Sequence, residues 1–182
     1  MSTAEGALVS SGANEMQVFK TVFSRCSSKT QCGGLKKTGG ILVMRCCCLN
    51  ECYGQTPANT QGNAMGTKDC DAACSDIAMY LCWKQTSPHT ENIYGFEGRT
   101  ADVVNVNCSH SVSSGGALSG SYYSVNPGAS IRFVQGVNGK EFDAFEAWET
   151  DQTVTYMNIV NNSFSSCVFF TSSARVTVFH GC

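Results

Sequence analysis

The stretch TVTYMNIV, residues 153–160, places its side chains alternately on two opposite faces. Val154 and Tyr156 fall on one face, and Thr155 and Met157 fall on the other. An alternation with a period of two is typical of a β-strand. Similar alternation occurs at 104–108 and 131–135, and two further strands are predicted at 166–171 and 175–180. The second half of the chain is therefore predicted to be built from short strands.

Turn-forming residues separate these strands. They occur at 113–116, 126–128, 138–139, 161–163 and 172–173. The pair Asn138-Gly139 is the strongest of these signals, because both residues tolerate the positive φ of a tight hairpin turn. The last two predicted strands look like a closing hairpin. Short strands joined by turns predict an all-β antiparallel sandwich or barrel over residues 99–182.

The first half follows another pattern. Asn14 as an N-cap, followed by Met16, Phe19, Val22, Phe23 and Cys26, predicts a short helix, and residues 70–82 predict a second one. Residues 41–44 predict a buried strand between the two helices. The predicted fold class is therefore α+β: a flexible N-terminus (1–13), a disulfide-rich domain with one or two short helices (14–98), and the antiparallel sandwich docked on it (99–182).

Twelve cysteines are present in 182 residues. They are Cys26, Cys32, Cys46, Cys47, Cys48, Cys52, Cys70, Cys74, Cys82, Cys108, Cys167 and Cys182. Such density favours disulfides over metal binding, because zinc-type spacing is missing. Nine cysteines precede residue 83 and three follow it. Because both counts are odd, complete pairing would require at least one disulfide between the two halves.

Cysteine usage also predicts the compartment. Disulfides persist in oxidising surroundings, so we expect a secreted protein whose signal peptide has been removed, since residues 1–17 do not resemble one. The sequons that begin at Asn107 and Asn161 agree with an extracellular route. No apolar run is long enough to predict a transmembrane segment.

Charge and motifs limit the functions to consider. A formal net charge of −2 argues against nucleic acid as a partner. No nucleotide-binding or metal-site motif occurs, so no cofactor and no metal are expected. A small secreted hydrolase would depend on Glu141, Asp143 and Glu146, which we interpret instead as a solvated acidic strand edge. No catalytic residue is assigned, and the protein is predicted not to be an enzyme.

The spacing from Cys52-Tyr53-Gly54 through Cys70, Cys74 and Cys82 to Ile93-Tyr94 resembles the second half of a WSC domain, a disulfide-rich carbohydrate-binding module. The chain lacks the Cys-x-Cys-Gly and Cys-Gly-Gly steps of that family, and we do not assign it there. The overall layout also looks like that of dual-domain effectors secreted by some plant-pathogenic fungi.

Aromatic residues near predicted loops are the candidate binding residues: Trp83, Tyr94, Tyr122, Tyr123 and Trp148. Exposed aromatic rings stack on sugars and anchor protein partners. The leading hypothesis is a secreted recognition protein, such as an effector, toxin or lectin-like module, that binds a protein or carbohydrate on an extracellular or host surface. The alternative is a structural subunit of a coat or extracellular matrix.

Overall fold

The computed structural model describes residues 7–29, 32–54, 64–82, 94–97, 100–110, 116–120, 129–137, 140–148, 152–160, 163–172 and 177–180. Side chains are described within residues 7–29, 32–54, 64–82, 100–107 and 109–110. The remaining described strands define a backbone path only.

The described residues form strands and no helix. The strands of the first half are β1 (Leu8–Ser11), β2 (Glu15–Phe19), β3 (Val22–Ser24), β4 (Ser27–Ser28), β5 (Leu35–Asn50), β6 (Tyr53–Gly54), β7 (Met65–Tyr80) and β8 (Tyr94–Glu97). Those that follow are β9 (Thr100–Ser109), β10 (Gly116–Gly120), β11 (Ala129–Val137), β12 (Lys140–Trp148), β13 (Gln152–Val160), β14 (Ser163–Ser172) and β15 (Thr177–His180).

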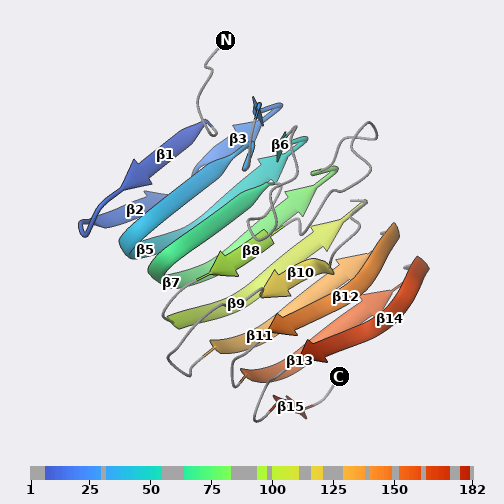
Figure 1. Cartoon of the computed structure of the whole chain (residues 1–182). Coiled ribbons are helices and arrows are strands. Elements are labelled where there is room, and N and C mark those ends of the chain that lie inside the picture. Colours follow the sequence, from blue (N-terminus) through green and yellow to red (C-terminus); the bar gives the residue numbers. More distant parts are fainter. Residues whose placement is uncertain are drawn as a thin grey trace.

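Every pairing between the described strands is parallel. After each coil the chain passes directly beside the position that it occupied one coil earlier. Leu8 pairs with Leu35, Leu35 with Met65, and Met65 with Tyr94. Residues far apart in sequence thus occupy equivalent positions in successive coils, which is the arrangement of a β-solenoid. Figure 1 shows β7, β9, β11 and β13 following one another as successive rungs.

Two stacks of strands run through the solenoid. One contains β8, β10, β12 and β14, and the other contains β9, β11, β13 and β15. The long strand β7 belongs to both stacks, because Met65–Lys68 pair with β8 and Asp71–Tyr80 pair with β9. In Figure 1 the arrows of β8, β10, β12 and β14 point against that of β9. Strands on both sides of residues 98 and 99 belong to the same sheet, because β7 pairs with both β8 and β9.

The predicted antiparallel sandwich is wrong. β11 pairs with β9 and β13, whereas β12 pairs with β10 and β14, so β11 and β12 do not form a hairpin. Likewise, β14 pairs with β12 and β15 with β13, so the predicted closing hairpin is wrong too. Alternation with a period of two identifies a strand but does not determine the direction of its partner.

Corners of the coil are made by residues with left-handed backbone conformation. One column of such residues comprises Lys20, Cys46, Asp76 and Asn105, with φ between 47° and 55°. A second column comprises Arg25, Glu51, Leu81 and His110, with φ between 50° and 53°. Left-handed residues reverse the local path of a strand, and non-glycine residues adopt that conformation at a cost. Different residue types adopt nearly the same positive φ at equivalent positions of successive coils, so the fold and not the residue type imposes these bends.

The two predicted helices are also wrong, and the corners explain why. Residues 14–26 form β2 and β3, while residues 70–82 lie mainly in β7. Phe19 and Val22, assigned to a buried helix face, are exposed, whereas Val18 is buried. Buried and exposed side chains alternate in β2 and again in β3, and the corner at Lys20 shifts this alternation by one residue between the two strands. Inward positions such as Met16, Phe23 and Cys26 therefore fall at intervals that imitate one face of a helix.

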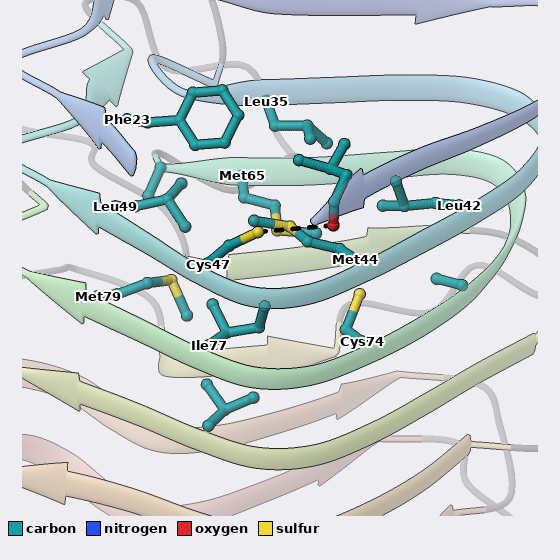
Figure 2. Packing of buried hydrophobic residues seen from close by; sticks show 14 of the residues in the cluster. Phe23, Leu35, Leu42, Met44, Cys47, Leu49, Met65, Cys74, Ile77 and Met79 are labelled. Atoms are coloured by element: carbon teal, nitrogen blue, oxygen red, sulfur yellow. Dashed lines mark hydrogen bonds between the residues drawn. The ribbon is translucent and has the colours of Figure 1, made fainter. Parts of the chain in front are cut away.

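The core consists of inward side chains stacked coil upon coil. Val18, Met44, Cys74 and Val103 form one such column through the pairing register, and Phe23, Leu49 and Met79 form another. Figure 2 shows Leu49, Met79, Ile77 and Cys74 in this packed interior. Each buried side chain contacts its equivalents above and below, so the core is continuous along the stack.

Two lysine side chains, Lys36 and Lys37, are buried among the described residues. Lys37 is fully buried, and its Nζ donates a hydrogen bond of 3.0 Å to the carbonyl oxygen of Gly12. Its register neighbour Thr67 has a buried Oγ1 that finds no partner among the described residues. Since an uncompensated buried polar group is costly, the hydrogen bond from Lys37 helps to fix the first coil against the second.

Candidate functional site

Two outward surfaces of the solenoid carry described side chains. The long face is the outward side of residues 15–19, 41–45, 71–75 and 100–104. The short face is the outward side of residues 22–24, 48–50, 78–80 and 107–109, together with the two corner columns that border it. The short face is therefore defined by backbone geometry that repeats in four coils.

The short face and its border carry three exposed large apolar side chains, Val22, Tyr80 and Leu81. Val22 is 69% exposed, Tyr80 42% and Leu81 40%. The rings of Tyr80 and His110 lie with their centroids 5.1 Å apart at an interplanar angle of 58°. This tilted contact is typical of interacting aromatic rings, and it holds Tyr80 in place while the side chain stays accessible. Tyr80, Leu81 and His110 thus form an exposed aromatic corner.

Polar contacts between coils stabilise the borders of the short face. The Nδ2 of Asn105 donates a 2.6 Å hydrogen bond to Oδ1 of Asp76, which is its neighbour in the corner column. Arg25 and Glu51 form an ion pair with Nε and Oε2 3.5 Å apart. Because both of these charged side chains are well exposed, the pair contributes little to stability. Its main effect is to order the surface.

The predicted binding residues occupy other parts of the chain. Trp83, Tyr122 and Tyr123 lie outside the described residues. Tyr94 begins β8 and Trp148 ends β12, so both belong to the stack that contains β10 and β14, and only their backbone is described. None of the five side chains is among those described, so their prediction as binding residues is not tested.

The acidic cluster considered for hydrolysis lies on β12. The pairing of β12 with β14 shifts register between Glu141 and Asp143. The extra residue lies on β14, which advances from Phe164 to Cys167 while β12 advances from Glu141 to Asp143, so the shift does not separate the two acidic residues onto opposite faces. Side chains on this strand are outside those described.

Sequence reasoning did not identify the aromatic corner. Tyr80 pairs with Ser109, the residue before His110, so their rings meet only because two coils stack in register. One sequence signal was available: Cys26, Cys52 and Cys82 each follow a corner residue at the same place in three successive coils. That recurrence would have revealed the repeat and, with it, the equivalence of positions around residues 80 and 109.

Those three cysteines form a column inside the corner, which we call the thiol column. The Sγ atoms of Cys26, Cys52 and Cys82 donate to the carbonyl oxygens of Ser24, Asn50 and Tyr80, at 3.4, 3.5 and 3.5 Å. Cys52 and Cys82 also donate to carbonyl oxygens of the preceding coil, those of Phe23 and Leu49, at 3.5 and 3.3 Å. Thiols thus act here as hydrogen-bond donors within the core.

Burial keeps the thiols of Cys52 and Cys82 protonated. It raises the pKa of Cys52 from 9.0 to about 12 and that of Cys82 to about 11. Desolvation also raises the pKa of Cys47, whose Sγ donates to the carbonyl oxygen of Arg45 at 3.2 Å. Since the thiolate is the reactive form, Cys52 and Cys82 are poor nucleophiles at neutral pH.

Alkaline pH is expected to destabilise the protein through these two groups. Between about pH 9 and pH 12 the unfolded chain loses thiol protons that the folded chain retains. The stabilisation is therefore fully present below about pH 9 and declines as pH rises through the raised pKa values. Urea unfolding of the wild type and of Cys52→Ser/Cys82→Ser across this range measures the effect.

The serine variant keeps a hydroxyl donor but does not titrate in this range, so its stability should fall less steeply with pH. Cys46→Ser, which changes an exposed thiol, should retain the slope of the wild type. If stability fell with pH equally steeply in the wild type and the double variant, Cys52 and Cys82 would not be the cause of the alkaline destabilisation.

No disulfide joins any two of the nine cysteines whose side chains the structure describes. The side chains of Cys108, Cys167 and Cys182 are outside this set, so the predicted disulfide between the two halves is not tested. Within the same residues, no group of three or more histidine, cysteine or acidic side chains could hold a metal ion. The described part of the chain also lacks any helix long and apolar enough to cross a membrane.

Comparison of the chain with protein-family models, with curated proteins and with solved structures found no match. Its class rests on its own geometry, which is that of a parallel β-solenoid.

Proposed function

We propose that this β-solenoid is a non-enzymatic recognition protein that binds a protein or carbohydrate partner through its short face. The observation that carries the proposal is the exposed aromatic corner of Tyr80, Leu81 and His110. Aromatic and apolar side chains that remain accessible on a folded surface commonly supply the anchors of a binding site.

The scaffold supports such a use. Strands on both sides of the short face are paired coil to coil, so its side chains are held before a partner arrives. A preorganised surface pays less ordering entropy on binding. Solenoids also offer extended surfaces along their length, on which several coils can contact one partner.

We also propose an extracellular setting, supported by the high cysteine content and by the sequon at Asn107. Asn107 is exposed on the short face, where a glycan would reach solvent. Expression of the chain through a secretory pathway, followed by mass spectrometry of the peptide that contains Asn107, tests this setting. An unmodified asparagine and retention inside the cell would contradict it.

Loss of the aromatic corner is expected to abolish binding. The test variant is Tyr80→Ala/Leu81→Asn, because asparagine tolerates the left-handed conformation of residue 81. Its binding to partners found on a glycan array, or by pull-down from extracellular extracts, should weaken by about tenfold or more, as for truncated anchor residues.

The matched control is Phe19→Ala/Ile41→Ala, which removes two side chains of similar exposure, 46% and 42%, from the long face. This variant should bind like the wild type. Equal loss in both variants would overturn the assignment to the short face. Concentration-dependent self-association in light scattering, without any partner, would favour the structural alternative.

A further inference from the structure

We propose that Cys26 and Cys52 form a thiol–disulfide site that links the first coil of the solenoid to the second when a small-molecule disulfide of the glutathione type oxidises it. The site is distinct from the short face, and it does not depend on the proposed function. It follows from the way the backbone and the two sulfur atoms are placed.

The backbone holds the two residues in register from both sides. Ser24 pairs with Asn50 before them, and Ser27 pairs with Tyr53 after them. The amide of Tyr53 donates to the carbonyl oxygen of Cys26 at 3.0 Å. Paired parallel strands lie about 4.8 Å apart, which is within the span of about 4.4–6.8 Å that disulfides bridge between Cα atoms.

The sulfur atoms are also turned toward one another. The Sγ of Cys52 reaches back to the carbonyl oxygen of Phe23 in the first coil, 3.5 Å away, and its thiol is hydrogen-bonded to that of Cys26. Cys82 instead reaches the carbonyl oxygen of Leu49 and the backbone of Cys52. Within the thiol column, the thiols of Cys26 and Cys52 are in direct contact.

Solvent access sets the order of the steps. Cys26 is half-buried, whereas Cys52 is fully buried. The Cys26 thiolate attacks one sulfur of oxidised glutathione, the S–S bond of glutathione breaks, and one glutathione thiol leaves. The sulfur of Cys52 then gives up its proton and attacks Cys26, which releases the second glutathione; because burial raises the pKa of Cys52, this second attack is the slow step. Two protein thiols are oxidised, and one glutathione disulfide is reduced to two thiols.

Closing this bond would secure the first coil. Among the described strands, β1, β2 and β3 pair with β5 alone, so the described part of the chain supports the first coil from one side. A covalent link between Cys26 and Cys52 limits the freedom of that coil when it opens, as disulfides do by restricting the unfolded chain. The site would thus make the stability of the first coil depend on the redox state of its surroundings.

Peptide mapping tests the site on the full chain. The reduced protein is incubated with oxidised glutathione, blocked with N-ethylmaleimide, and digested with trypsin and Glu-C without reduction. Cleavage after Arg25, Lys29, Glu51 and Lys68 separates Cys26 from Cys52 and both from the other cysteines. We expect a cross-linked species that joins residues 26–29 to residues 52–68.

Urea unfolding gives the second readout. Oxidation should raise the unfolding midpoint of the wild type by about 1 M urea relative to the dithiothreitol-reduced form. Cys26→Ser should lose both the cross-link and the shift, and Cys46→Ser should keep both. A glutathione adduct on Cys26 without the cross-link, a link from residues 52–68 to the peptide of Cys82, or an unchanged midpoint would overturn the proposal.

Discussion

Gly33→Ala is expected to destabilise the protein by about 3 kcal/mol or more, with loss of the first two coils from the folded structure. A methyl group at residue 33 would lie within 3.0 Å of three backbone atoms, the carbonyl oxygen of Cys26 and the nitrogen and oxygen of Tyr53. Cys26 and Tyr53 are joined there by a backbone hydrogen bond. No side chain can move aside to make room, so the backbone itself must shift.

The matched control for this prediction is Gly12→Ala. Gly12 has φ +106°, but no atom lies within 4 Å of the position that a Cβ would take. Alanine there suffers only conformational strain, which costs about 1 kcal/mol. Urea unfolding monitored by circular dichroism compares the two variants. Equal stability of Gly33→Ala and the wild type would show that the first two coils do not approach each other as described.

Leu42→Ala is expected to lower the free energy of unfolding by about 3–5 kcal/mol, near the upper end of the usual range for this substitution. Leu42 is fully buried in the interior shown in Figure 2. Its register neighbour in the next coil is Ala72, which in turn pairs with Ala101. Ala72 and Ala101 are too small to fill the cavity that the substitution leaves, so Met16, the register neighbour of Leu42 in the first coil, is the large side chain beside it in this column.

The adjacent residue on β5 provides the control for Leu42. Ile41 points to the opposite side of the strand and is 42% exposed. Ile41→Ala should therefore cost less than about 1 kcal/mol, as surface substitutions usually do. The difference between the two variants, measured by chemical unfolding, reports the inward and outward assignment of this strand. Similar losses for both would contradict the register of the solenoid.

The strands of the second half could be predicted from sequence because their side chains alternate without interruption. Residues 153–160 lie within β13, and residues 131–135 lie within β11. Strand direction could not be predicted, because alternation specifies only which side of a strand is buried. Asn138-Gly139 was misleading as a hairpin signal, because β11 and β12, which precede and follow it, pair with other strands and not with each other.

The first half was harder to predict because its strands bend. Cys46 and Asp76 adopt the left-handed backbone conformation, but neither is a glycine, so the sequence gives no signal for a bend at these positions. Each corner shifts the alternation by one residue, and the resulting intervals resemble those of a helix. In the same way, residue types alone could not reveal the aromatic corner, because Tyr80 and His110 become neighbours only through the stacking of coils.

Thiols that donate to backbone carbonyls have a consequence for how this chain tolerates change. Along the thiol column, a small side chain with one donor satisfies a carbonyl oxygen at each corner. Thr21 does the same at another corner, where its Oγ1 donates to the carbonyl oxygen of Phe19 at 2.9 Å. For folding, each corner requires a small side chain that donates a hydrogen bond; sulfur itself is required only for the disulfide proposed between Cys26 and Cys52. Serine and threonine can therefore replace cysteine at these corners, and the number of cysteines can fall without loss of the fold.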